Sequence, residues 1–333
     1  MSGEAVPYHL RQNKHVDRQL FIELLSHVNR VIPIAKALYV SFGGVYFEDF
    51  KLIHQVFGAR KLLSVEKHKW VLERQMHNRP YGCITCKHMT SRELVNSIDD
   101  IRGSHRGPLV CWLDFAEAAK RRGQLEDVEI LSKSVRHFDV LRVTMNVNPA
   151  SLAAQLPTET NDACAARRLV QLNEQFSDKV TREPEIGDVG REGFPRFCGE
   201  MIRRSIHIGL KSNSRLLFQP LGSYTYSDSD HTMLTVTGIF LNTDRVDEFL
   251  ERSQLKDFDF AGLEWQTLHI NVPLLSHREK LTLDQRFGTR QSASQIAARL
   301  GFQVDQKPEV SREMLTSYFK FHRYYPHFHR INY

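Results

Sequence analysis

The chain has 333 residues, of which 41% are hydrophobic and 25% charged, which is ordinary for a folded globular protein. Collagen-like and disordered chains are excluded, and because no run of about 18 apolar residues occurs, we expect no membrane span. The five cysteines and the polar N-terminus favour a reducing compartment over secretion, so we expect a cytoplasmic protein. The net charge of +6 permits contact with a polyanion without requiring it.

Short apolar runs alternate with segments of helical periodicity through the first half of the chain. Strands are predicted at 36–44, 60–68, 82–89, 108–115 and 138–147. Helices are predicted between them at 47–58, where Gly58 is a natural stop, and at 69–78, 90–98 and 127–138. The runs are nearly continuous, as in strands buried on both faces, so this rhythm predicts βαβ units and a parallel sheet with helices on both sides.

The pattern changes after Pro149. Helices are predicted at 162–176 and 196–212, with a Gly- and Pro-containing loop at 182–195 between them. Two β-rich runs, 215–228 and 231–241, are separated by a short polar turn, which indicates an antiparallel hairpin.

These elements predict an α/β fold with a Rossmann-like, mostly parallel, seven-stranded sheet that ends in an antiparallel hairpin. The predicted organisation is an N-terminal helical extension (1–30), the sheet domain (31–241) and a C-terminal accessory helical element (242–333) packed on it. Helical patterns at 292–302 and from 311 onward support the last part.

The turn after the first strand reads Ser41-Phe42-Gly43-Gly44. In open α/β sheets, ligands bind outside the carboxyl ends of the strands, and glycines let the backbone approach them closely. Glu48 and Asp49 begin the next helix and disfavour a phosphate at its N-terminus. The turn therefore suits a cationic or zwitterionic ligand better than a pyrophosphate.

Two acids stand at the ends of later strands. Glu66 follows Gly44 by 22 residues, and a carboxylate at that place commonly accepts hydrogen bonds from ribose hydroxyls; the alternative is a surface acid beside Lys67. Asp114 ends the fourth strand, where acids often face the reacting group; the alternative is a helix cap or a structural acid.

The order of elements, the Gly43-Gly44 pair, Glu66 and the hairpin together resemble the class I S-adenosylmethionine-dependent methyltransferases over about residues 31–241. More narrowly, the chain resembles uncharacterised bacterial O-methyltransferase-like proteins. The resemblance implies S-adenosylmethionine as cofactor, adenine near Thr85 to His88, and Asp114 near the methyl-transfer centre as the catalytic residue. The cofactor-binding residues that it implies are Ser41, Gly43, Gly44, Glu66, Lys67 and His88.

The first loop differs from the usual family pattern, because Ser41 and a glycine pair replace an acid and three spaced glycines. An Asn/Asp-Pro-Pro-aromatic motif is also absent from the fourth strand. The alternative is therefore a catalytically degenerate module of the same fold that binds a nucleotide-like ligand, a protein partner or nucleic acid.

Three further segments carry candidate chemistry. Cys83 and Cys86 form one CxxC, but a structural zinc site needs four ligands and no second pair exists, so buried thiols are favoured. Residues 9–31 place Arg11, Lys14 and Arg18 at the start of an amphipathic helix; they either bind an anionic group or form a solvated helix start with Asp17 as its cap.

The aromatic and basic tail 318–333 either packs on the core or contacts nucleic acid. His231 and His207 are the other candidate proton-transfer groups. No nucleophile elbow, P-loop or His-Glu-x-x-His motif supports a hydrolase, NTPase or zincin.

Overall fold

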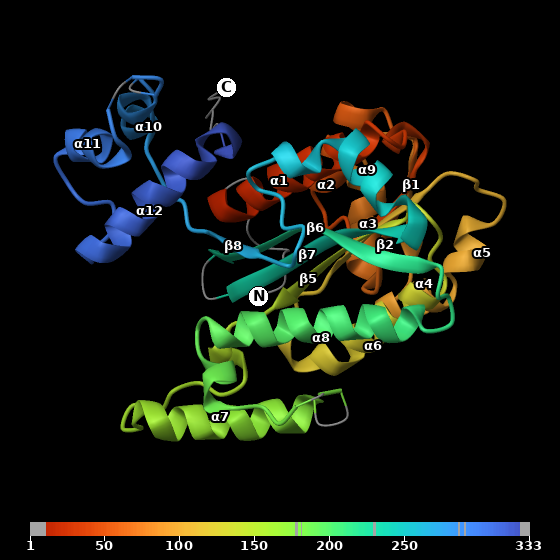
Figure 1. The fold of residues 1–333 in the computed structure, drawn as a ribbon, viewed down its shortest axis with the longest axis horizontal. Helices are drawn as coiled ribbons and strands as arrows, with labels where there is room; N and C mark the ends of the chain where they lie inside the picture. Colours follow the sequence, from red (N-terminus) through yellow and green to blue (C-terminus); the bar gives the residue numbers. More distant parts are fainter. Residues whose placement is uncertain are drawn as a thin grey trace.

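The computed structural model describes residues 11–176, 179–180, 182–228, 231–285, 287–289 and 291–326. One sheet of eight strands, in the order β3-β2-β1-β4-β5-β7-β6-β8, forms the centre of the molecule (Figure 1). The strands are β1 (Leu38–Ser41), β2 (Lys61–Glu66), β3 (Ile84–His88), β4 (Leu109–Asp114), β5 (Val140–Asn146), β6 (Leu216–Asp228), β7 (His231–Asn242) and β8 (Thr267–Ile270).

The pairing of the strands confirms the Rossmann-like prediction. β1 pairs in parallel with β2 and β4, and the parallel pairs β2–β3 and β4–β5 extend the sheet on each side. β7 runs antiparallel between β5 and β6, so the hairpin forms as expected, with Asp228 opposite His231. Its turn residues, 229 and 230, lie outside the described part of the chain.

The prediction of seven strands was wrong by one. β8 pairs in parallel with β6 at the sheet edge, within the segment expected to be helical. It has four residues, and only Ile270 is buried, so it lacks the apolar run that marks the other strands. Hydrogen bonds to β6 hold β8 in the sheet. A partner strand that lies more than 40 residues away in the sequence leaves no mark on the local hydrophobic pattern.

Helices cover both faces of the sheet. They are α1 (Gln12–Asn29), α2 (Glu48–Phe57), α3 (Lys69–Asn78), α4 (Ser91–Asn96), α5 (Ile98–Arg102), α6 (Arg121–Lys133), α7 (Asn161–Phe176), α8 (Gly193–Leu210), α9 (Val246–Ser253), α10 (His277–Asp284), α11 (Ala293–Ala297) and α12 (Pro308–Phe321). Two helices begin earlier than the sequence predicted, because α6 begins six residues before the expected 127 and α8 begins inside the expected loop 182–195. The helix expected at 90–98 forms as two, α4 and α5.

Alternating strand side chains divide the core into two layers. Tyr39 of β1 packs into a layer with α1, α2, α9 and α12, whereas its neighbours Leu38 and Val40 pack into a layer with α4, α6 and α8. Figure 1 shows these two sets of helices on opposite sides of the sheet. Burial on both faces explains the continuous apolar runs; all seven residues of β5, for example, are buried.

Candidate functional site

A cavity of about 680 Å³ lies at the carboxyl ends of β1, β2 and β4. The strand register brings the predicted site residues to it. Ser41 of β1 pairs with Ser64 of β2 and with Trp112 of β4, so the positions two residues further on, Gly43, Glu66 and Asp114, lie at one edge of the sheet. The glycine turn therefore lies between the two carboxylates.

The turn after β1 is tightly packed on one side. The Gly43 amide donates to Ser64 Oγ at 3.2 Å, and a Cβ built on Gly43 would lie 2.8 Å from that oxygen and 2.9 Å from the rings of Phe47 and Phe50. Gly44 has a φ of +55°, in the left-handed region that favours glycine. Both glycines are thus required by geometry, and Gly44 leaves its part of the cavity wall without a side chain.

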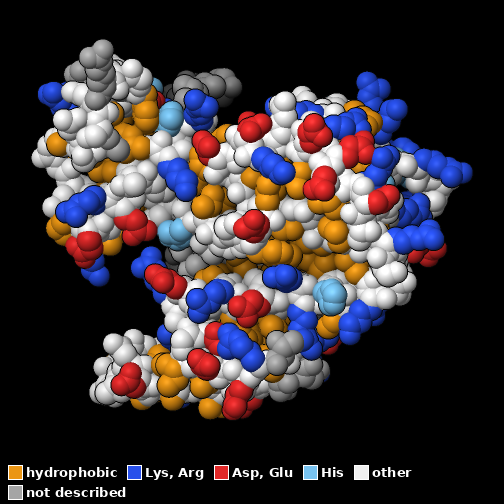
Figure 2. All heavy atoms as spheres, viewed as in Figure 1, with side chains coloured by type: hydrophobic (Ala, Val, Ile, Leu, Met, Phe, Trp, Pro, Cys, Tyr) orange, Lys and Arg blue, Asp and Glu red, His pale blue; other side chains and the backbone are white. Residues whose placement is uncertain are grey.

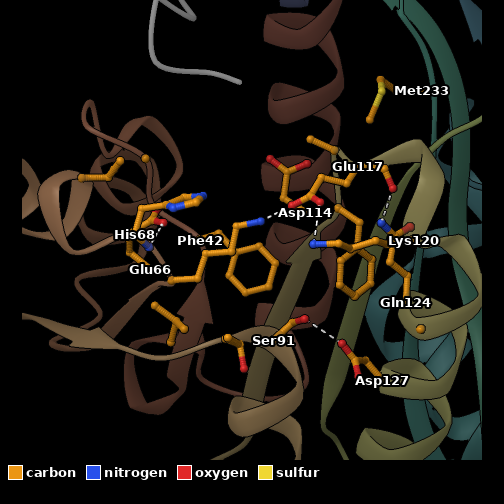
Figure 3. A pocket seen from close by; sticks show the side chains of 18 of the residues that line it. Phe42, Glu66, His68, Ser91, Asp114, Glu117, Lys120, Gln124, Asp127 and Met233 are labelled. Carbon is orange, nitrogen blue, oxygen red and sulfur yellow. Dashed lines mark hydrogen bonds and ion pairs between the residues drawn. The ribbon is translucent and has the colours of Figure 1, made fainter. Parts of the chain in front are cut away.

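Glu66 lies across the cavity from Asp114 (Figure 3). Its side chain is half-buried, and its Oε1 accepts a hydrogen bond from the His68 amide at 2.8 Å. Among the described residues this is the one hydrogen bond to the carboxylate, so Oε2 remains an acceptor toward the cavity.

Asp114 is held by cations from α1. Lys14 Nζ lies 3.2 Å from Asp114 Oδ2, and the Asp114 side chain is 20% exposed. Burial by itself raises the pKa of this carboxyl group, but the positive charges of Lys14, Arg18 and Arg142 outweigh it and hold the pKa below the ordinary aspartate value. Asp114 is therefore ionised at neutral pH.

The start of α1 lies against the cavity and is not a solvated helix start, because Lys14 and Arg18 are buried. Arg11 and Lys14 line the cavity, and Arg18 lies with Gly43 and Asp114 around a small adjoining space. The expectation that Asp17 caps the helix was wrong. α1 begins at Gln12, and Asp17 is fully buried in an ion pair with Arg142, 2.5 Å from its Nη2.

Another wall of the cavity is formed by the loop after β4 and by the first turns of α4 and α6. Lys67 and Lys120 both form ion pairs with Glu117, which tie the end of β2 to the loop after β4. These contacts lower the pKa of Glu117 to about 2. On α4 and α6, Ser91 Oγ donates to Asp127 Oδ2 at 2.6 Å (Figure 3).

The structure brings four of the seven predicted site residues to the cavity wall: Gly44, Glu66, Lys67 and Asp114. The other three lie beside it. Ser41 is buried beneath the turn, Gly43 faces the small adjoining space, and His88 is exposed with its Nε2 2.8 Å from the Lys67 carbonyl oxygen.

Near β3, the wall begins at Met89 rather than in the expected segment Thr85 to His88, because β3 runs to His88 and only the residues after its end face the cavity. Sequence reasoning missed Glu117, Lys120 and Gln124, which also line the cavity. They were missed because the sequence predicted this helix to begin at 127. α6 begins at Arg121, so these residues lie on the loop after β4 and on the first turn of α6.

The remaining candidates are placed elsewhere, except His231, which lines the cavity. His207 is exposed on α8. Cys83 Sγ lies 3.8 Å from His54 Nδ1, and no group of three or more metal-ligating side chains is found among the described residues. The tail packs on the core, the first of its two alternatives, through buried Tyr318, Phe321 and Tyr325, and 327–333 lie outside the described residues.

None of the helices in the described ranges has the length and apolarity needed to span a bilayer. On the face shown in Figure 2, acidic and basic side chains are interspersed over most of the surface.

The residues around the cavity fit S-adenosylmethionine. The nucleoside of this cofactor carries two adjacent hydroxyl donors and a flat base. The cavity volume of about 680 Å³ falls in the range of common ligand pockets, about 300–1,000 Å³. Glu66 supplies a carboxylate acceptor, and the rings of Phe42 and Phe115, with centroids 6.1 Å apart, supply apolar surface. The bare backbone at Gly44 gives room for close approach.

The sequence of the chain matches a known protein family. The model of a family described as "Putative O-methyltransferase" matches residues 6–333. Among solved structures, the chain is similar to Trm1 from Pyrococcus horikoshii in complex with S-adenosyl-L-methionine, at 15% identity and a TM-score of 0.42 over 71% of this chain and 57% of that chain. It thus spans little more than half of Trm1.

A second similar structure is an S-adenosylmethionine-dependent methyltransferase, described as putative, from Listeria monocytogenes, at 9% identity and a TM-score of 0.35 over 66% of this chain and 98% of that one. No curated protein matches the chain. Because the family model covers nearly the whole sequence, the chain belongs to the family described as "Putative O-methyltransferase".

Proposed function

We propose that this protein transfers a methyl group from S-adenosylmethionine to an oxygen atom of its acceptor, in the cavity at the carboxyl ends of the strands. The observation that carries the proposal is the placement of Gly44, Glu66 and Asp114 around that one cavity. When bound, the cofactor supplies an electrophilic methyl group on a sulfonium sulfur. Gly44 and Glu66 bind it, and Lys67 closes that side of the cavity through its ion pair with Glu117.

Asp114 is assigned to the acceptor. Its lowered pKa makes it a weak base, so it would accept a hydrogen bond from the acceptor hydroxyl and orient it, and the hydroxyl proton would leave to solvent water as the methyl–oxygen bond forms and the methyl–sulfur bond breaks. Lys14 holds the carboxylate in place at 3.2 Å. Alignment of two bound reactants supplies much of the catalysis that a displacement of this kind needs.

Cofactor binding tests the proposal directly. S-adenosylhomocysteine at 100 times its dissociation constant is expected to stabilise the folded protein by about 2.7 kcal/mol in a thermal-shift experiment. Glu66→Ala is expected to remove most of this shift while the protein still unfolds cooperatively. Glu73→Ala, on the exposed side of α3, is the matched control and should keep the shift. If S-adenosylhomocysteine does not shift the melting temperature of the folded wild-type protein, the proposal is refuted.

A second candidate is the catalytically degenerate module, which binds the nucleoside and docks a protein or nucleic acid without transferring a methyl group. The ion pair that engages Asp114 with Lys14 favours it, because a paired carboxylate is less available to an acceptor. Bound S-adenosylmethionine that is never converted to S-adenosylhomocysteine supports this candidate. A nucleic-acid partner would show an affinity that falls steeply with salt.

We also propose a cytoplasmic location. The five cysteines are all free, including Cys111, Cys164 and Cys198 in the buried core, as expected for a reducing compartment. Cell fractionation tests it.

A further inference from the structure

The exposed face of α8 is basic along its whole length. Arg196, Glu200, Arg203, His207 and Lys211 follow one another at helical spacing, and all five are exposed. From the first to the last of them the helix rises by about 22 Å. The opposite face of α8 is buried. In Figure 2, basic side chains and one histidine form a row along α8, with an acidic side chain among them.

The cations of this face are not neutralised by acids of the protein. None of its arginine and lysine side chains forms an ion pair with a residue in the described ranges. By contrast, Arg122 and Lys133 on the adjacent helix α6 each pair with an acid one turn away. The acid of the basic face, Glu200, lies 3.7 Å from Arg182, outside α8. The positive charge of the face is therefore available to a polyanion.

Aromatic surface lies beside the basic face. The Arg203 guanidinium lies over the Trp265 ring, 5.4 Å from its centroid, and the Phe218 ring lies 5.6 Å from the same ring. Trp265 and Phe218 are both half-buried. Trp265 also has a φ of +68°, which a tryptophan rarely adopts, and strain of this kind is typical of functional positions. Figure 2 shows apolar surface directly beside the row of basic side chains.

The basic face begins close to the cavity. Phe194, in the first turn of α8, packs under Arg121, whose Cζ lies 4.9 Å from the ring centroid. Arg121 directly follows Lys120 of the cavity wall. α8 also approaches β7 at Leu234, one residue after Met233, which lines the cavity. A chain bound along this face therefore reaches the cavity from the start of α8.

This combination matches a single strand of nucleic acid. Cations spaced along a helix neutralise successive phosphates, and aromatic rings at the surface stack on unpaired bases. A duplex keeps its bases stacked on one another, and an acidic protein surface offers no ring in every unit. The aromatic surface beside Arg203 therefore favours a single strand over both.

We propose that the exposed face of α8, together with Trp265, binds single-stranded RNA and leads it to the cavity. The choice of RNA rests on the proposed function, in which Asp114 accepts a hydrogen bond from an acceptor hydroxyl. RNA carries a 2′-hydroxyl on each nucleotide, and DNA does not. RNA is thus the class of methyl acceptor.

Fluorescence anisotropy of the full-length protein with a labelled RNA of about 12 nucleotides tests the inference without any turnover. With three phosphate contacts, the logarithm of the association constant is expected to fall with the logarithm of the salt concentration with a slope of about −2. A triple variant of the basic face is expected to bind at least tenfold more weakly at about 50 mM salt, with a slope near zero. Its substitutions are Arg196→Gln, Arg203→Gln and Lys211→Gln.

The matched control removes the same charge from exposed positions outside α8, by Lys256→Gln, Arg278→Gln and Arg312→Gln, and should bind within about twofold of the wild-type protein. Trp265→Ala is expected to weaken binding about tenfold through the loss of a stacked base, and Trp265→Phe should keep most of the affinity. A DNA strand of the same sequence should bind more weakly than the RNA.

An unchanged affinity in the triple variant of α8, or an equal loss in the control, would overturn the role of this face. DNA binding as tight as RNA would overturn the choice of RNA, and polyglutamate binding as tight would indicate an acidic protein partner instead. If the RNA does not bind while S-adenosylhomocysteine still shifts the melting temperature, this inference fails and the proposed function stands. RNA binding without any cofactor shift would refute the proposed function and leave α8 as a binding surface.

Discussion

At the scale of single residues, the buried ion pair of Asp17 and Arg142 links α1 to the middle of the sheet. Both side chains are fully buried, Thr235 donates to Asp17 Oδ1 at 2.7 Å, and the Arg142 guanidinium lies 4.7 Å from the ring centroids of Phe21 and Trp112. Such a pair adds little stability in itself, but removing one partner leaves a charge buried without compensation.

Asp17→Ala is accordingly expected to lower the free energy of unfolding by about 3–5 kcal/mol, measured by urea denaturation. Replacing both partners, as in Asp17→Leu with Arg142→Met, should recover most of that loss because no charge remains buried. A loss below about 1 kcal/mol in the single variant, the size seen for exposed pairs, would contradict the assignment.

The ionisation of Asp114 depends on Lys14. Lys14→Met is expected to raise the pKa of Asp114, because burial then acts with less opposition from nearby cations. In the wild-type protein, a lowered carboxyl pKa contributes stability above the unfolded pKa of about 3.9, and that contribution is lost as the pH falls through the folded value. A carboxyl-carbon NMR titration of both proteins measures the change; an unaltered Asp114 pKa would mean that Lys14 does not hold it.

At the scale of elements, the turn between β1 and α2 and the first turn of α6 contain glycines with opposite surroundings. Gly43 is surrounded by Ser64, Phe47 and Phe50, whereas Gly123 faces open space. The turn that carries Gly43 and Gly44 is therefore fixed by packing, and the helix surface at Gly123 is not.

The same substitution should thus have opposite effects at the two glycines. Gly43→Ala is expected to destabilise the protein by about 1–3 kcal/mol, because the new methyl group overpacks the turn, and to weaken S-adenosylhomocysteine binding. Gly123→Ala is expected to be neutral or stabilising by up to about 1 kcal/mol, since alanine is the better helix former. Thermal melts with and without ligand compare the two, and equal effects would refute the packing argument.

At the scale of the whole molecule, the three predicted parts share one core layer. Leu20 and Leu24 of α1, Tyr39 of β1 and Phe321 of α12 belong to the same buried cluster. Asn13 adds a polar link, because its Nδ2 donates to the Ser227 carbonyl oxygen at 2.8 Å and its Oδ1 accepts from the Val272 amide at the same distance. The N-terminal helix thus joins β6 to the C-terminal segment.

We expect the chain to unfold in a single calorimetric transition, because neither terminal part buries its apolar face without the sheet domain. Asn13→Ala should lower the melting temperature without splitting that transition, since it leaves two backbone groups without partners. Two separate transitions would instead favour independent domains with the boundaries predicted at 30 and 241, which stay a prediction until then.

The sequence by itself determined the elements that local periodicity encodes. The first five strands, the hairpin and the stop of α2 at Gly58 were all predictable, because burial on both faces leaves continuous apolar runs and left-handed backbone favours glycine. The strand ends also placed Glu66 and Asp114 at one edge of the sheet, since parallel strands share the direction of their carboxyl ends.

Only the tertiary structure decided which side chains meet there. Lys14 reaches Asp114 across 100 positions of chain, and β8 exists because β6 offers it an edge. Each of these depends on the docking of separate elements. Docking is set by packing summed over many residues, which a local pattern does not record.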